Sequence, residues 1–479
     1  MRSTLTLLII LTACLPAAVR ADPFAHTWCR LTTARFEIVA DLTPRDLRRL
    51  AEQMEVFRVT ARAFIHADGK AAELPLKVIV FRNHDDFRTS MKTPQFSGFM
   101  QPSLRQAMLV IGPQLNNRLL HETALHEYTH YLLRNLIDVS FPAWYDEGLA
   151  SFLSTMSMTK RHVYIGNVPQ YHLRNAFQSG SVSLKDTVES HSVYDWEPSE
   201  LNDFYLMAWA LVHFIELSHK VGFDDRRPHL DEYLRAVIRP FEATFDTSYE
   251  QLDQELRRYT RKRKLPKIRL PRPKLALPSP DVQCLDDQNR DYELARAMMH
   301  RNPEAALATM AALHVRNPTD VRYLIGLSTA HYGLRQYTES MNFAEQALAM
   351  APQDASAQIE FATRLVHGCM LVRAPGCAQK WNRAVKLFRS GIRQDPQRFD
   401  AVLGLGLSYL HSGRPGDALN YLRIAYQKAP WAPRINFYLG ECYRLIGDRR
   451  AVVHLTNARN WSTQQIWQRL ADAALAELD

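Results

Sequence analysis

The N-terminal part is organised around HEYTH, the stretch His126-Glu127-Tyr128-Thr129-His130, inside a run whose apolar spacing predicts a helix over residues 117–136. Histidines four positions apart lie on one face of a helix, about one turn from each other, so both imidazoles can reach one metal ion. Glu127 projects toward the same open side, beside the place of a metal-bound water molecule. The pattern predicts a catalytic zinc site.

A catalytic zinc ion takes three protein ligands and leaves a fourth position to water, so a third ligand should follow this helix. Glu147 stands in the segment 142–150 (PAWYDEGLA), after sixteen intervening residues. Asp146 is either an acceptor for an imidazole N–H or a solvated carboxylate at a helix start. His121 falls off the ligand face, and we expect it to be a surface residue.

The two motifs, H-E-x-x-H at 126–130 and W-x-x-E-G-x-A at 144–150, together resemble the gluzincin branch of zinc metallopeptidases. More narrowly, they resemble the bacterial peptidase-MA-like group, which is often joined to tetratricopeptide repeats. The similarity covers roughly residues 28–259. It implies that His126, His130 and Glu147 bind Zn²⁺ and that Glu127 acts as general base.

The same resemblance implies a substrate path and a second oxyanion donor. An extended peptide would pair with the strand before the zinc helix, at residues 106–111. Tyr205 stands where gluzincins commonly present a tyrosine, and it is the candidate donor to the oxyanion. The alternative is that its ring packs on Trp209. His213 and Tyr194 are weaker candidates for the donor.

The elements around these motifs alternate in type. Strands are predicted at residues 35–40, 76–81 and 106–111, a helix at 44–64, and mostly helix from 117 to 259. We therefore expect an α+β domain with a small mixed sheet followed by helices.

The C-terminal part repeats every 34 residues. Pro396 and Pro430, Gly406 and Gly440, and Tyr409 and Tyr443 all stand 34 apart, which is the tetratricopeptide period. We expect an α-solenoid of about four units. The unit from Pro352 to Pro396 spans 44 residues, and we assign the excess to a loop at residues 367–377. A disulfide between Cys369 and Cys377 should close that loop, with two free thiols as the alternative.

A basic, proline-rich stretch separates the two parts. Residues 257–274 hold ten Lys or Arg and no acid, so the remaining chain carries about −1 of the net +9. Several prolines exclude a long helix, which predicts an extended interdomain linker. A patch for nucleic acid or anionic lipid is the alternative, and no nucleic-acid partner is expected.

The N-terminus carries an export signal. Residues 5–15 are apolar and follow Arg2, but they are too short to span a membrane. Cleavage after Ala21 and lipidation of Cys14, within the lipobox-like Leu11-Thr12-Ala13-Cys14, are equal alternatives. Either alternative predicts a periplasmic protein, which lipidated Cys14 would attach to a membrane.

The 479 residues, 46% hydrophobic and 23% charged, exclude a largely disordered or fibrous chain. We divide them into a signal peptide (1–21), a gluzincin-like metallopeptidase domain (22–259), the linker (260–283) and the solenoid (284–479). The expected function is zinc-dependent hydrolysis of a peptide or protein substrate, with a protein partner recruited by the repeats. The alternative is a non-catalytic periplasmic scaffold or assembly factor, which would have no use for Glu127.

Overall fold

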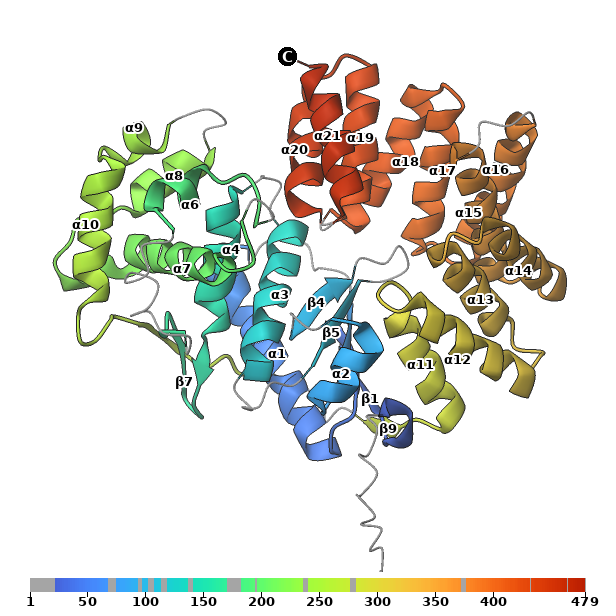
Figure 1. Ribbon diagram of the computed structural model, residues 1–479, viewed down its shortest axis with the longest axis horizontal. Coiled ribbons are helices and arrows are strands. Elements are labelled where there is room, and N and C mark those ends of the chain that lie inside the picture. Colours follow the sequence, from blue (N-terminus) through green and yellow to red (C-terminus); the bar gives the residue numbers. More distant parts are fainter. Residues whose placement is uncertain are drawn as a thin grey trace, which may run out of the picture.

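The computed structural model in Figure 1 shows a mixed α/β region followed by an arc of helices. It describes residues 22–67, 75–93, 97–101, 107–112, 119–136, 141–169, 182–193, 196–235, 240–275, 281–371, 376–430, 432–462 and 464–478. The predicted signal peptide and Cys14 lie outside these residues. Among the described helices, none is both long enough and apolar enough to cross a bilayer.

Six strands in the described part form one mixed sheet, in the order β4-β5-β3-β2-β1-β9. β2, β3 and β5 are parallel, whereas β4, β1 and β9 run antiparallel to their neighbours. The three predicted strands correspond to β2, β3 and β5, so the mixed sheet is confirmed. The strands are β1 (Cys29–Thr32), β2 (Phe36–Ala40), β3 (Leu76–Val80), β4 (Gly98–Gln101), β5 (Met108–Ile111) and β9 (Val282–Cys284).

Helices cover both faces of this sheet. On one face, Ile38, Val78 and Leu109 pack with α1 (Pro44–Phe64) and α3 (Leu119–Leu136). The alternate residues Val39, Ile79 and Val110 face the other way, because side chains alternate along a strand. They share a core with α2 (His84–Met91) and with the first helices of the repeat region.

The repeat region therefore completes the N-terminal core. α11 (Asp287–Met298) contributes Leu294 and Met298 to the core on the second face. Its Glu293 pairs with the buried Lys77 of β3 at 2.7 Å and with Arg30 of β1 at 2.7 Å. The two parts are joined by a continuous core as well as by the chain.

The predicted linker is extended but built into the N-terminal region. β8 (Ile268–Pro271) pairs with β7 (His162–Ile165), which also pairs with β6 (Ser157–Met158). β9 then pairs with β1, and the register places Cys29 opposite Cys284, to which it is disulfide-bonded. This disulfide thus links the two ends of the N-terminal region.

The helices after α3 complete the N-terminal part, as predicted. α4 and α7 pack closely against each other, and α3 packs on α4. These elements are α4 (Ala143–Ser154), α6 (Leu184–Glu189), α7 (Leu201–Leu217), the 3-10 segment η3 (Ser218–Val221), α8 (Arg227–Arg235), α9 (Phe241–Phe245) and α10 (Tyr249–Thr260). A second 3-10 segment, η1 (Pro23–Ala25), precedes β1.

The described C-terminal part consists of five helix pairs and a final helix, one pair more than the expected four. The disulfide between Cys369 and Cys377 is confirmed. The long unit differs from the prediction, because its excess residues lengthen α15 and α16 on either side of the turn. The remaining helices are α12 (Pro303–Arg316), α13 (Val321–Gly333), α14 (Tyr337–Met350), α15 (Ala355–Leu371), α16 (Cys377–Gln394), α17 (Phe399–His411), α18 (Pro415–Lys428), α19 (Pro433–Leu445), α20 (Ala451–Trp461) and α21 (Gln465–Ala476).

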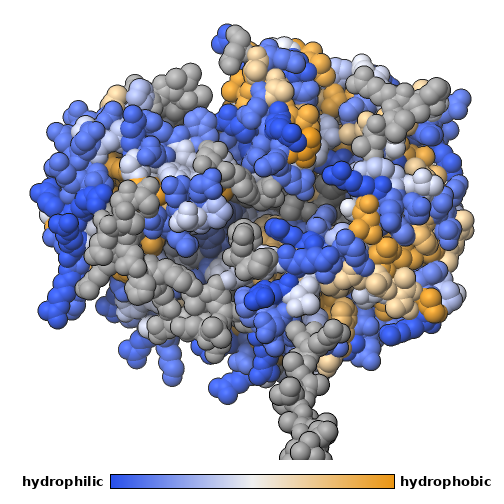
Figure 2. Space-filling model, in the orientation of Figure 1, coloured by the Kyte–Doolittle hydropathy of each residue, from blue (hydrophilic) through white to orange (hydrophobic). Residues whose placement is uncertain are grey.

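The 34-residue repeat of glycines has a packing cause. A Cβ at Gly406 would lie 2.8 Å from Leu422, and one at Gly440 would lie 2.7 Å from Leu455. Each glycine lets the two helices of one pair approach closely. At the end of the array, α19–α21 expose apolar side chains, and Figure 2 shows hydrophobic residues at the top of the molecule. These side chains are Leu445, Ile446, Val452, Val453, Ile466 and Leu470.

Candidate metal centre

Two helices present the predicted zinc ligands to each other. α3 carries His126 and His130 on one face, and α4 carries Glu147. The glycine after Glu147 fixes the position of α4, because a Cβ at Gly148 would lie only 2.5 Å from the carbonyl oxygen of Ala208 on α7. The motif glycine thus permits the close packing of α4 on α7 that holds Glu147 in place.

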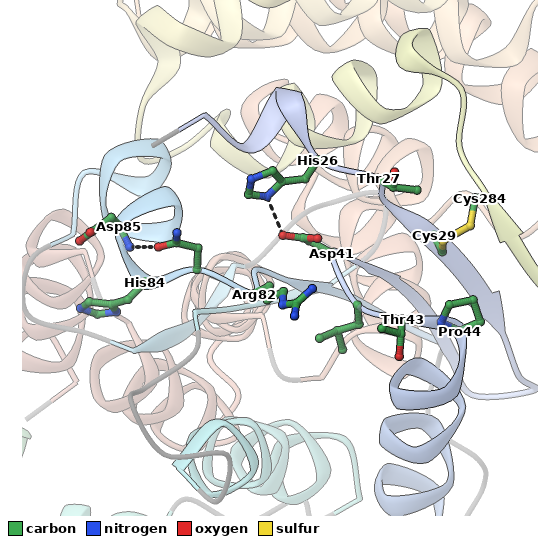
Figure 3. A pocket seen from close by; sticks show the side chains of 12 residues that line it. His26, Thr27, Cys29, Asp41, Thr43, Pro44, Arg82, His84, Asp85 and Cys284 are labelled. Atoms are coloured by element: carbon green, nitrogen blue, oxygen red, sulfur yellow. Dashed lines mark hydrogen bonds and ion pairs between the residues drawn. A yellow bond between two sulfur atoms is a disulfide. The ribbon is translucent and has the colours of Figure 1, made fainter. Parts of the chain in front are cut away.

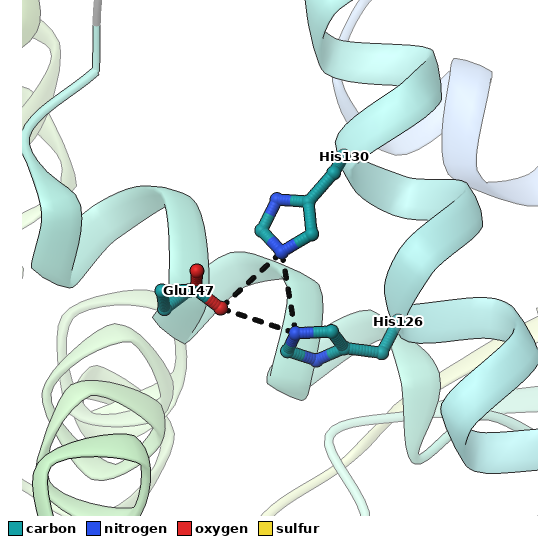
Figure 4. A group of neighbouring side chains, drawn as sticks. All are labelled: His126, His130 and Glu147. Carbon is teal, nitrogen blue, oxygen red and sulfur yellow. Dashed lines mark hydrogen bonds and ion pairs between the residues drawn. The ribbon is translucent and has the colours of Figure 1, made fainter. Parts of the chain in front are cut away.

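The three side chains converge on one point (Figure 4). Nε2 of His126 lies 3.1 Å from Oε2 of Glu147, and Nε2 of His130 lies 3.2 Å from the same oxygen. The two Nε2 atoms are 3.2 Å apart. Ligand atoms around a tetrahedral zinc ion with bonds of ~2.0–2.1 Å are about 3.3 Å apart, so these residues fit Zn²⁺.

Asp146 holds His130 in the orientation that a metal ligand needs. Nδ1 of His130 lies 3.0 Å from Oδ1 of Asp146, so Nδ1–H donates to this carboxylate and Nε2 is the ring nitrogen placed to bind a metal ion. The acceptor role considered for Asp146 is therefore the one observed. On His126, Nδ1 lies 3.5 Å from the Ser151 hydroxyl, a partner that the sequence motif did not indicate.

The centre is strongly negative. Burial opposes the charged form of His130, but the carboxylates of Asp146 and Glu147 outweigh it and raise the pKa of His130 to about 10. Burial would raise the pKa of Glu147, but His130 and His126 hold it well below its usual range. A buried site that stabilises positive charge this strongly has the electrostatics of a cation site.

Glu127, next to His126 on α3, contacts the edge strand of the sheet. Its Oε2 accepts a hydrogen bond of 3.2 Å from the backbone N–H of Met100 on β4. In an antiparallel ladder, facing residue pairs alternate between hydrogen-bonded and non-hydrogen-bonded pairs. Ser97 and Gly112 form a hydrogen-bonded pair, so Met100, three positions further along and opposite Leu109, belongs to a non-hydrogen-bonded pair. The N–H of Met100 therefore points away from β5. Glu127 thus faces an outward-pointing strand amide.

The predicted docking strand at residues 106–111 was wrong. β5 is paired on both sides, with β3 and β4, so its backbone is already used within the sheet. Gln106 lies outside the described residues. β4 is the edge of the described sheet on this side, and its sequence, GFMQ, lacks the β-branched or alternating apolar pattern that marks a strand.

The candidate oxyanion donors occupy different places. Tyr205 lies beside the centre, its ring centroid 6.0 Å from that of His126 in an edge-to-face arrangement. His213 is wrong as a candidate, because it is fully buried and joined to the Gly166 carbonyl at 3.1 Å and the Tyr259 hydroxyl at 2.7 Å. Burial lowers the pKa of His213 to about 4, so it is neutral. Tyr194 and the side chain of His121 lie outside the described residues.

Comparisons with known proteins bear on the repeats. The tetratricopeptide repeat family model matches residues 378–433. A thermophilic tetratricopeptide-repeat protein of Thermus thermophilus is 18% identical over 40% of this chain and 99% of its own, with a TM-score of 0.35. YrrB, a TPR protein with an unusual peptide-binding site, is 16% identical over 39% of this chain and 91% of its own, with a TM-score of 0.28. A search of curated proteins found no match.

The C-terminal part thus contains tetratricopeptide repeats, which suggest binding of a protein or peptide. The family match stops short of the N-terminal region and gives no support for a gluzincin domain. The metallopeptidase resemblance remains a prediction that depends on the geometry of residues 126–147.

Proposed function

We propose that the protein is a zinc-dependent peptidase of the gluzincin type, exported from a bacterial cell, whose repeats recruit a protein partner or substrate. The convergence of His126, His130 and Glu147 within 3.1–3.2 Å is the observation that carries this proposal. Two imidazoles and one carboxylate would hold Zn²⁺ and leave one position open, which is the donor set of a catalytic site.

Each residue around the centre then has a role. Bound zinc would supply an acidified water molecule and a Lewis acid for the scissile carbonyl. Glu127 would take the proton from that water and pass it to the leaving amine. Asp146 fixes the ring of His130 through Nδ1. Tyr205 is the candidate hydrogen-bond donor to the developing oxyanion.

The edge strand β4 is the proposed docking site for an extended peptide. Its Met100 N–H faces outward and donates to Glu127, so a substrate strand paired along β4 would lie beside the general base. The proposal replaces β5, which has no free edge in the described sheet.

Other features support export and recruitment. Two disulfides suit an oxidising compartment such as the periplasm. On the repeats, Arg434 of α19 lies over the rings of Tyr438 and Trp467 and contacts His367 of α15 at 2.8 Å. Tyr438 and His367 are buried, whereas Arg434 and Trp467 are partly exposed. We assign Arg434 and Trp467 to partner contact, since Arg and Trp side chains are enriched in binding hot spots. Arg434→Ala should weaken partner binding while hydrolysis of short peptides is unchanged.

The proposal is tested by metal content and activity together. We expect about one Zn²⁺ at the centre of the wild type, loss of peptide hydrolysis on chelation, and recovery when Zn²⁺ is returned. His126→Ala and Glu147→Ala should lose this ion and the activity, whereas His191→Ala, at an exposed histidine outside the centre, should keep both. Full hydrolysis by a chelated wild type, or by folded Glu147→Ala, would contradict the proposal.

A further inference from the structure

A second cluster of possible ligands lies at the carboxyl ends of two parallel strands. Asp41 directly follows β2, Asp86 lies in the first turn of α2 after β3, and His26 follows η1. Nδ1 of His26 lies 2.7 Å from Oδ2 of Asp41 and 3.5 Å from Oδ2 of Asp86. One ligand atom from each residue thus lies within 4.8 Å of the other two. The cluster shares no residue with the centre on α3 and α4.

Asp86 is the observation that points to a bound ion. Its side chain is only 2% exposed, yet neither carboxylate oxygen accepts a hydrogen bond from any described residue. A single ring N–H of His26 serves one acceptor, and its short contact is with Asp41. Burial raises the pKa of Asp86. His26 acts to lower this pKa, whereas the nearby carboxylate of Asp41 acts to raise it. A buried carboxylate without hydrogen bonds costs free energy unless a cation compensates it.

The cluster can be reached from solvent. Two of its residues, His26 and Asp41, line a cavity of about 940 Å³, in which Figure 3 shows them joined, with Arg82 and Thr43 nearby. The side chain of His26 is 37% exposed. An ion could enter on this side and keep water molecules as its remaining ligands.

We propose that His26, Asp41 and Asp86 bind a divalent transition-metal cation of the Zn²⁺ or Mn²⁺ class. One imidazole with two carboxylates suits these ions, whereas Ca²⁺ takes six to eight oxygen ligands. The site joins the N-terminal segment to the sheet and to α2. η1 and α2 both contact α11, so the bound ion lies where these segments meet the first repeat helix. The proposal does not depend on the peptidase function.

The experiment uses the full-length chain, freed of metal and then titrated with Zn²⁺ and, separately, with Mn²⁺. We expect two Zn²⁺ per wild-type chain, and one in Asp86→Asn and in His26→Gln. Asp85→Asn is the matched control, because Asp85 is an exposed residue in the same turn of α2 and bears the same charge. It should keep two. In chains that also carry His130→Ala, which removes a ligand of the first centre, Mn²⁺ should raise the thermal midpoint with Asp85→Asn but not with Asp86→Asn.

His130→Ala separates this site from the first one. A chain that loses one ion through His130→Ala and the other through Asp86→Asn supports both sites. Loss through Asp86→Asn alone supports this inference and contradicts the zinc centre on α3 and α4. If Asp86→Asn and His26→Gln both still bind two Zn²⁺ per chain, the inference is overturned. If Asp86→Asn does not fold, the number of Zn²⁺ bound by His26→Gln decides between the two outcomes.

Discussion

The joint core of the sheet and the repeats can be tested at the buried ion pair between Lys77 and Glu293. Lys77 is 1% exposed, and its Nζ lies 2.7 Å from Glu293 on α11 and 3.0 Å from the partly exposed Glu37. Glu293→Gln removes the nearer carboxylate and leaves the ammonium with Glu37 alone. Lys77→Met removes the other partner, although Glu293 then keeps Arg30 at 2.7 Å.

The expected magnitudes follow from these contacts. Breaking a buried pair from one side typically costs about 3–5 kcal/mol, and because Glu37 remains we expect about 2–3 kcal/mol for Glu293→Gln. Lys77→Met should cost less, about 1–2 kcal/mol, since Arg30 still compensates Glu293. The double variant, Lys77→Met with Glu293→Gln, should lose about 1–2 kcal/mol less stability than the two single variants lose together. The reason is that neither charge is then left buried without its partner.

The assay is urea unfolding of the four proteins, followed by circular dichroism. Glu345→Gln on α14 is the control, because Glu345 is an exposed glutamate of the repeats and its change should cost under about 0.5 kcal/mol. Two results would refute a shared core between the sheet and α11. One is a loss of unfolding free energy in Glu293→Gln no larger than in Glu345→Gln; the other is a double variant whose loss equals the sum of the losses in the two single variants.

Three further predictions concern the edge strand, the disulfides and a buried acid. Met100→Pro removes an outward amide together with its hydrogen bond to Glu127, so the chain should fold and keep Zn²⁺ while KM for an extended peptide rises about tenfold or more. Met100→Leu is the control, and equal KM values would exclude β4. Cys284→Ser opens a loop of 255 residues and should lower the free energy of unfolding by about 5 kcal/mol. Cys377→Ser opens a loop of 8 residues and should lower it by about 2.5 kcal/mol. Unfolding curves that show a larger loss for Cys377→Ser would contradict this. Burial raises the pKa of Glu216 to about 7, so between about pH 4.5 and 7 the folded chain keeps a proton that the unfolded chain releases. The free energy of unfolding should therefore fall as pH rises through this window, by up to about 3 kcal/mol at about 1.4 kcal/mol per pKa unit. This pH dependence should disappear in Glu216→Gln, and an unchanged slope would assign it to another group.

The convergence at the metal centre was predictable because helix geometry alone brings positions four apart together. The i and i+4 histidines needed only a helix, and the motif W-x-x-E-G-x-A indicated the residue that meets them. The role of Gly148 could not be derived, since its neighbour Ala208 lies sixty residues later in the chain.

The second face of the sheet and the edge strand were missed for different reasons. Leu76–Val80 is buried at every position, a pattern typical of strands covered on both faces, so the sequence held a signal that a second layer was needed. Nothing local indicated that the cover comes from α11, more than two hundred residues away. The edge strand β4 (GFMQ) starts with glycine and shows no regular apolar alternation, whereas β5, of the same length, is a continuous apolar run (MLVI).

The central claim is that Glu127 acts as a general base on zinc-bound water, and one measurement tests it most directly. Wild type and Glu127→Gln, each shown to hold the ion at His126, His130 and Glu147, are compared for their rate of hydrolysis of a peptide library. General-base assistance is typically worth ~10²–10⁴ in rate, so Glu127→Gln should keep its zinc and lose at least about a hundredfold in turnover. Equal rates in the two zinc-loaded proteins would contradict the account.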